Sequence, residues 1–388
     1  MRSVSIIGIG ETKMGRLPDR TLHDLIREAG NKAIEDAGIE KSQIDALCMG
    51  NFNSSYLCGQ GHMGPLASEA LGLGDIPTVR TEGACASGSL ALRMAMLGIM
   101  SGVYKVVLVG GVEKMTHQPT ETVTSAIASA MDYEYEAMQG FTFPACFAMM
   151  ANRYFYEHRD VKREMGMCAY NAHQNALLNP DAQMQKDFSL EKILSADLIA
   201  APLSLFDCSL VTDGAAFMVL ASGDVADSLK SKHRRVDIIG QGHAGDTLTL
   251  AAKKSITSFA ASKKAAAQAY GMAGVKPSDI DLAEVHDCFT ITQIINTEDL
   301  GFFEPGKGGD AVAEGVTART GKKPINTSGG LKAKGHPIGA TGISQIYEIV
   351  TQLRGEAGPR QIAKADTGLA QNLGGTAATC VITIMQGR

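Results

Sequence analysis

The sequence predicts an α/β protein in which two similar halves build a five-layer α-β-α-β-α sandwich. Three observations lead to this fold: a strand–helix–turn–strand pattern that occurs twice, two helices with few charged residues, and one long segment without a counterpart. A length of 388 residues suits two domains better than one. We therefore expect an N-terminal half, residues 1–225, and a C-terminal half, residues 226–388.

The repeated pattern opens each half. An apolar strand that ends in Gly-x-Gly is followed by a helix, and the helix stops at a glycine, Gly38 in the first half and Gly274 in the second. The first helix has Thr21 and Asp24 spaced as a capping box. The first strands are 4–10 and 236–242, and the second strands are 46–49 and 282–285.

Two further helices, which follow Cys85 and Gly342, carry few charges. A helix that is apolar on every side is buried, so we place both in the central layer. We pair the strands that come after them, 105–110 and 377–384. Strands that alternate with helices indicate mixed or parallel sheets covered on both faces. Residues 117–205 have no counterpart in the second half and are interpreted as an insertion over the active site.

Composition and charge exclude several classes of protein. The net charge is −5 without a basic run, which argues against a nucleic-acid binder. No stretch approaches the roughly 20 apolar residues that cross a bilayer, and the N-terminal apolar run is too short for a signal peptide. We expect a cytoplasmic protein. None of the eight cysteines forms a Cys-x-x-Cys pair, so neither a zinc ribbon nor a dithiol motif is predicted.

Cys85 is the first candidate for chemistry, because it lies among small residues directly before an apolar helix. The N-terminus of a helix lowers the pKa of a thiol, although a cysteine there is as often structural. His336 opens the corresponding helix of the second half, so the repeat should bring it close to Cys85 as a base.

Two further segments carry candidate groups. His286 and Cys288 are two residues apart after a predicted strand and should point the same way. A metal pair is disfavoured because no third ligand is evident, and proton transfer beside a carbonyl suits them better. The glycine turn at Gly374 and Gly375 offers backbone N–H groups for an oxyanion hole, a weak signal on its own.

Taken together, the ordered motifs resemble those of the thiolase superfamily over nearly the whole chain. The match is closest to archaeal and bacterial thiolases that are similar to sterol-carrier-protein thiolases. The motifs are Ala84-Cys85-Ala86-Ser87-Gly88, Gly110-Gly111-Val112-Glu113-Lys114-Met115, His286-Asp287-Cys288-Phe289, Gly335-His336-Pro337-Ile338-Gly339-Ala340-Thr341-Gly342 and Asn372-Leu373-Gly374-Gly375.

The resemblance implies the duplicated fold and an acyltransferase that uses coenzyme A as co-substrate, with no permanently bound cofactor and no metal. Many thiolases have their acid/base cysteine where this chain has Asn372, and Cys380 lies beyond the glycines in an apolar strand. The resemblance therefore assigns that role to Cys288, with His286 as hydrogen-bond donor. Cys85 would be the acylated nucleophile, His336 its base, and the N–H groups of Cys85 and Gly374 or Gly375 the oxyanion hole.

The resemblance also implies a homodimer or homotetramer, and a small partner protein with a zinc ribbon and an OB-fold that helps to bind coenzyme A. Two other functions stay open: a decarboxylating ketoacyl synthase, which needs no second thiol, and a non-catalytic acyl-CoA or lipid-binding subunit. The acyl chain is not determined by the sequence. Aromatic and methionine side chains of the insertion either wall an acyl pocket or pack against the insertion itself: Tyr133, Tyr135, Met138, Phe141, Phe143, Met149 and Met150.

Overall fold

The computed structural model describes residues 2–229 and 231–388, and nine strands in it form one sheet with the order β3-β2-β4-β7-β1-β8-β11-β10-β9. The strands are β1 Val4–Glu11, β2 Ala46–Gly50, β3 Thr78–Thr81, β4 Val106–Glu113, β7 Gly214–Ser222, β8 Val236–Gly245, β9 Leu282–Glu284, β10 Thr367–Gly374 and β11 Thr379–Gly387. The helices outside the insertion are α1 Leu22–Ala37, α2 Ser54–Leu57, α3 Met63–Leu71, α4 Ser87–Met100, α9 Gly223–Ser228, α10 Ala260–Ala273, α11 Thr290–Asp299, α12 Gly308–Ala313 and α13 Thr341–Arg354.

The duplication is visible in the strand order. The sequence β2-β4-β7-β1 on one side of the sheet is mirrored by β9-β10-β11-β8 on the other. The two sets meet where β1 pairs with β8, over only three residue pairs that include Val4 with Ile238. This short ladder joins what we expected to be two separate sheets.

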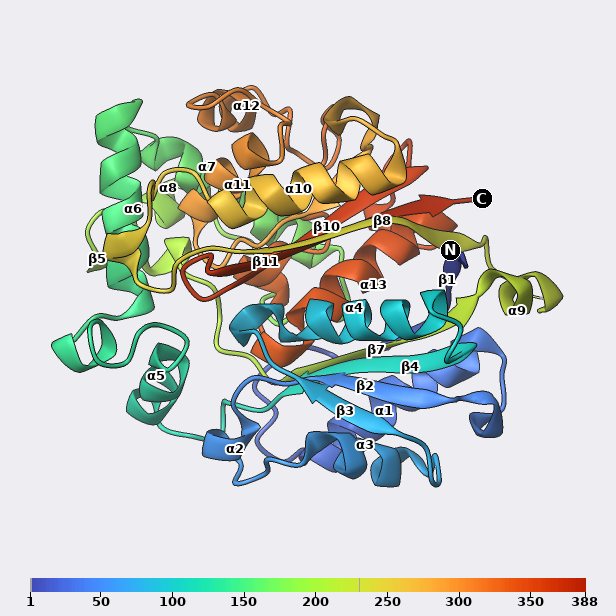
Figure 1. Ribbon diagram of the computed structural model, residues 1–388. Coiled ribbons are helices and arrows are strands. Elements are labelled where there is room, and N and C mark those ends of the chain that lie inside the picture. Colours follow the sequence, from blue (N-terminus) through green and yellow to red (C-terminus); the bar gives the residue numbers. More distant parts are fainter. Residues whose placement is uncertain (1, 230) are drawn as a thin grey trace.

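The five predicted layers are present (Figure 1). Helices α4 and α13 lie between the two halves of the sheet, α1 and α3 cover the outer face of one half, and α10 covers the outer face of the other. One hydrophobic cluster joins both central helices to strands of both halves, and Leu92 and Ile346 are fully buried in it. The core that positions the site is therefore shared by the two halves of the chain.

The Gly-x-Gly repeat has a structural cause in close helix–strand packing. A Cβ atom on Gly10 of β1 would lie 2.4 Å from the carbonyl oxygen of Ala29 in α1, and one on Gly242 of β8 would lie 1.9 Å from that of Ala265 in α10. Both positions require glycine because the helix backbone occupies the place of a side chain. The α1 capping box at Thr21 is formed as predicted, and Gly38 ends α1 at φ 65°.

Two expectations about the repeat need correction. The strand after α13 is β10, not 377–384, and the latter segment, β11, corresponds to β7. β10 is inconspicuous in the sequence because polar Gln371 and Asn372 occupy its centre. Helix α13 is buried along nearly its whole length, but α4 is not buried all round, since Met94 and Leu97 are 49% and 45% exposed.

The chain between β4 and β7 forms a mainly helical layer beside the sheet. Its elements are α5 Thr120–Ala128, α6 Phe143–Glu157, α7 Lys162–Leu177, α8 Leu190–Leu194, β5 Leu198–Ala200 and β6 Leu203–Ser204. Phe147 of α6 is fully buried and stacks on Phe289, with ring centroids 4.6 Å apart. In the ranges 2–229 and 231–388, no helix combines the length and apolarity that crossing a membrane requires.

Candidate active site

Cys85 lies on a sharp turn between β3 and α4. Ala84 has φ 51°, a left-handed conformation that is unfavourable for a residue with a side chain, and one 3-10 turn over Ala84–Ala86 leads into the helix. The turn is held by two short hydrogen bonds. The Ala84 N–H donates to Glu82 Oε1 at 2.6 Å, and the Ser87 hydroxyl donates to the Ala84 carbonyl at 2.6 Å. This turn holds Cys85 at the entrance to the helix.

His336 lies between a π-helical turn, Gly330–Lys334, and the start of α13. Its backbone N–H donates to Thr212 Oγ1 at 2.9 Å, and its ring Nδ1 lies 2.6 Å from Thr341 Oγ1. Backbone and ring are thus both fixed, and Nε2 remains free to face the site.

His286 follows β9 and is held from three sides. Its N–H donates to Gln371 Oε1 at 3.2 Å, its carbonyl accepts from Asn296 Nδ2 at 2.9 Å, and its Nδ1 lies 3.2 Å from Asn372 Nδ2. Gln371 and Asn372 are the polar residues that interrupt the apolar pattern of β10. Their side chains hold His286, which explains the unusual composition of this strand. As in His336, the ring nitrogen without a fixed partner is Nε2.

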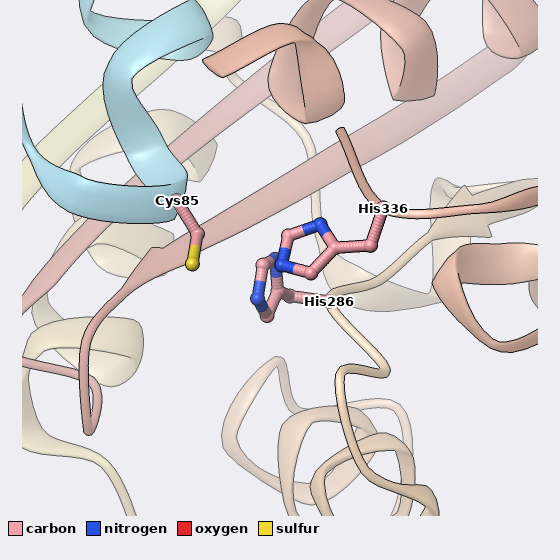
Figure 2. Close-up of side chains that lie close together, drawn as sticks. All are labelled: Cys85, His286 and His336. Atoms are coloured by element: carbon pink, nitrogen blue, oxygen red, sulfur yellow. The ribbon is translucent and has the colours of Figure 1, made fainter. Parts of the chain in front are cut away.

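The sulfur of Cys85 and one nitrogen from each histidine lie within 4.8 Å of one another (Figure 2). The two imidazole rings meet edge to face, with centroids 5.2 Å apart and an interplanar angle of 83°. Sulfur and imidazole nitrogen are also the ligands that zinc prefers. A bound ion would, however, occupy the lone pairs that a nucleophile and a base need.

Cys85, His286, Cys288 and His336 line one cavity of about 380 Å³, together with Gly375. The cavity therefore brings together all four side chains singled out in the sequence. None of its lining residues carries a charged side chain. The other residues that line it are Met115, Thr124, Ile127, Thr142, Phe143, Pro144, Ile199, Cys208, Ser209, Leu210, Val211, Phe289 and Ile338.

Burial dominates the electrostatics of the two thiols. It raises the pKa of Cys85 to about 12, although the backbone N–H groups of Gly375 and of Cys85 itself act in the opposite direction. The expectation that the helix N-terminus lowers this pKa is not met, because the loss of hydration outweighs the backbone N–H groups. Burial also raises the pKa of Cys288 well above the usual range, and nearby Cys85 adds to the effect.

The pKa values of the two histidines shift in the opposite direction. Burial lowers the pKa of His336 to about 3, and burial together with the neighbouring His336 lowers the pKa of His286 well below its usual value. At neutral pH the cavity thus contains two thiols and two neutral imidazoles.

Sequence reasoning missed several groups that build the site. Thr341 and Asn372 contact the histidine rings, and Cys208 lines the cavity. Glu113 is buried and accepts hydrogen bonds from the N–H groups of Phe52 at 2.8 Å and Gly339 at 3.1 Å. It thereby ties the first half of the chain to the loop that bears His336. The Gly110–Met115 motif was visible in the sequence, but its role depends on this tertiary contact.

Most of the aromatic and methionine side chains of the insertion do not line the cavity. Of its seven aromatic and methionine candidates, only Phe143 is among the lining residues. Tyr133, Tyr135 and Met138 are 64%, 73% and 67% exposed, whereas Met150 is fully buried. Most of these side chains thus take no part in the cavity wall.

A duplicated five-layer α/β sandwich, with cysteine and histidine side chains lining one uncharged cavity between its halves, is the architecture of a class of cysteine-dependent α/β enzymes. Family models agree with this assignment: the thiolase N-terminal domain matches residues 4–224, and the thiolase C-terminal domain-like model matches residues 242–387. The chain belongs to the thiolase family, and it is an acyltransferase.

Curated relatives match over the whole chain. The acetyl-CoA acetyltransferases of Methanothermobacter thermautotrophicus and Methanocaldococcus jannaschii are 44% and 45% identical, over 99% of this chain and 99% of each relative. Sterol carrier protein 2 of Bos taurus is 35% identical over 96% of this chain and 70% of its own length.

Two solved structures share the fold. The Ltp2-ChsH2(DUF35) aldolase has a TM-score of 0.85 and 26% identity, and the match covers 99% of this chain and 98% of that one. The Acat5 thiolase from Ascaris suum, in complex with coenzyme A, has a TM-score of 0.75 and 18% identity, with both chains fully covered.

Proposed function

We propose that this thiolase cleaves a 3-oxoacyl-CoA with coenzyme A through an acyl group on Cys85. In the opposite direction, it catalyses the Claisen condensation of two acyl-CoA molecules through the same intermediate. The observation that carries the proposal is that Cys85 and Cys288 share one uncharged cavity with His286 and His336. One thiol can then hold the acyl group while the other moves a proton at the carbon beside it. The names of the archaeal relatives support acetoacetyl-CoA as a first substrate to test.

In the first step, the Cys85 sulfur attacks the 3-oxo carbon and its proton passes to Nε2 of His336. Because burial disfavours both the thiolate and the imidazolium, we expect proton transfer to accompany the attack. The N–H groups of Cys85 and Gly375 lie at the sulfur and support an oxyanion hole there, with Gly374 as the alternative second donor.

In the second step, the bond between the 2- and 3-carbons breaks and the electron pair moves onto the thioester of the departing acetyl-CoA enolate. His286 and the protonated His336 donate hydrogen bonds to its oxygen. Cys288 protonates the enolate carbon, and in condensation its thiolate removes that proton. Coenzyme A then takes the acyl group from Cys85 as a thioester; its thiol proton passes to the Cys288 thiolate, and His336 returns its proton to the Cys85 sulfur.

The test is coenzyme-A-dependent cleavage of a panel of 3-oxoacyl-CoA thioesters, beginning with acetoacetyl-CoA. Wild type should cleave at least one, and Cys48→Ala, which removes a buried thiol of β2 outside the cavity, should behave as wild type. If no thioester is cleaved but a decarboxylating condensation occurs, the chain is a ketoacyl synthase. If the protein carries no acyl label at all, it is a binding subunit.

We also propose an assembly for this chain in the cytoplasm: a homodimer or homotetramer with a small zinc-ribbon and OB-fold partner that holds the nucleotide of coenzyme A. Two observations support a partner. The cavity wall offers no cation for a phosphate, and a structural relative is described as a pair, Ltp2-ChsH2(DUF35). Co-purification of a small subunit that lowers KM for coenzyme A would support this assembly, whereas full activity of the isolated chain would contradict it.

The remaining part of the proposal concerns the organisation of the chain. We propose that residues 1–225 and 226–388 are its two structural halves, with the insertion at about 117–205. The family models, which match residues 4–224 and 242–387, support this division.

A further inference from the structure

The two histidines of the cavity have chemically different partners on Nδ1. His336 Nδ1 lies 2.6 Å from a hydroxyl, that of Thr341, and His286 Nδ1 lies 3.2 Å from an amide nitrogen, that of Asn372. A neutral imidazole carries one N–H, so the partner of one ring nitrogen decides whether the other is a donor or an acceptor.

The hydroxyl of Thr341 makes His336 a proton acceptor at Nε2. Besides its contact with His336, Thr341 Oγ1 lies 3.0 Å from the carbonyl oxygen of Pro337. The hydroxyl has one proton, so both contacts are hydrogen bonds only if Thr341 donates to Pro337 and accepts from Nδ1–H of His336. The lone pair is then on Nε2, the nitrogen left to face the cavity.

The contact with Asn372 favours the opposite tautomer for His286, with the ring proton on Nε2. The structure places the amide nitrogen of Asn372 at Nδ1 of His286, and an amide NH2 group can only donate, so in this orientation Nδ1 accepts and the ring N–H is on Nε2. In this orientation Asn372 Oδ1 is buried without a hydrogen-bond partner among the described residues. Pairing of Asn372 with Val381 of β11 holds the backbone at this position.

We propose that Asn372 is a positioning residue that holds His286 in its Nε2–H form, so that the two histidines before Cys85 are not equivalent. His336 takes a proton, and His286 is a permanent hydrogen-bond donor to the thioester oxygen. The inference rests on the proposed function for these roles, but the protonated nitrogen is a property of the protein alone. The lowered pKa values keep both rings neutral at working pH, which a fixed tautomer requires.

Nitrogen NMR of the full chain with 15N-labelled histidine tests the tautomers directly. In wild type we expect a protonated Nε2 and a bare Nδ1 for His286, and the reverse for His336. Asn372→Leu should give mixed states for His286 alone. Asn372→Asp, which has nearly the same shape but accepts where the amide donates, should move the proton to Nδ1 or charge the ring. A protonated Nδ1 on His286 in wild type would overturn the proposal.

Kinetics provide a readout that loss of packing would not produce. Asn372→Leu should lower kcat by about 10–100-fold with little change in KM, yet leave alkylation of Cys85 by iodoacetamide at the wild-type rate, because His336 is untouched. Thr341→Val should disturb His336 and not His286, and Thr341→Ser should restore the wild-type spectrum. Full kcat in a folded Asn372→Leu would overturn the proposal.

The two measurements separate this inference from the proposed function. If wild type cleaves no 3-oxoacyl-CoA but shows the expected tautomers, the proposed function fails and the positioning by Asn372 stands. If wild type is an active thiolase with His286 protonated on Nδ1, the positioning fails and the function stands.

Discussion

Cys85 and Cys288 come from opposite halves of the chain and line the same cavity, and each thiol is close enough to the other for Cys85 to raise the pKa of Cys288. Cys85 precedes central helix α4, and Cys288 follows β9 and precedes α11. The duplication therefore assembles the site: one half supplies the candidate nucleophile and the other supplies the groups that transfer protons.

Removing the second thiol should separate the two chemical steps. Cys288→Ala leaves Cys85 and His336 in place, so acyl transfer from acetyl-CoA to Cys85 should continue. Cleavage of acetoacetyl-CoA should fall by about 10²–10⁴-fold, the range for loss of a general acid or base. Acylation is measured by radiolabel and cleavage by loss of the 3-oxothioester. Wild-type cleavage in this variant would remove Cys288 from the mechanism.

The raised pKa of Cys85 has a consequence for its alkylation. Because burial raises that pKa to about 12, the thiolate fraction of Cys85 should rise about tenfold per pH unit across the neutral range. The rate of iodoacetamide modification at residue 85, followed by peptide mass spectrometry, should therefore climb from pH 6 to pH 9 without levelling. A plateau below pH 9 would mean that a thiolate–imidazolium pair already exists at rest.

Buried histidines should make the protein less stable in acid. Burial lowers the pKa of His173 to about 4, so between pH 6.5 and 4 the unfolded chain binds a proton that the folded one does not. Stability from this group is present above pH 6.5 and is lost as the pH falls, by about 1.4 kcal/mol per pH unit.

His173→Phe isolates this contribution, since the ring packs edge-on against Phe188 and Phe206. The variant's free energy of unfolding, measured by urea titration at several pH values, should depend less steeply on pH in that window. An unchanged slope would show that His173 is already charged in the folded protein.

Phe143 should limit the length of the acyl chain. It lines the cavity from the start of α6, and its ring centroid lies 6.4 Å from that of Phe147. Phe143→Ala should raise the kcat/KM ratio of longer to shorter 3-oxoacyl-CoA substrates by about tenfold, the discrimination that one methylene group provides. Met149→Ala, on the same helix but outside the cavity lining, is the matched control. Equal ratios in both variants would place the acyl group elsewhere.

The layered fold was predictable from the sequence because, in each half, close packing of a helix against the first strand requires glycine at a fixed position. Gly10 and Gly242 repeat since each lies under a helix backbone, and Thr21 and Gly38 mark the bounds of α1. β10 escaped detection because the polar side chains of Gln371 and Asn372 serve His286, and the apolar pattern of a strand is interrupted there.

The candidate site was predictable only in part. Cys85, His286, Cys288 and His336 were found by motif, and the structure brings them together at one cavity. The direction of the Cys85 pKa shift was not predictable, because it depends on how many residues from distant segments exclude water from the sulfur. The contribution of Glu113 was hidden for the same reason, since its partner Gly339 lies in the other half of the chain.

The central claim is that Cys85 carries the acyl group. The most direct measurement is to incubate wild type with radiolabelled acetyl-CoA, quench with acid, and locate the label by mass spectrometry of the peptides. We predict one acetyl group per chain, on Cys85, that is released by coenzyme A and absent in Cys85→Ser. Label on Cys288 or Cys208, or no label in an enzyme that still cleaves acetoacetyl-CoA, would contradict the account.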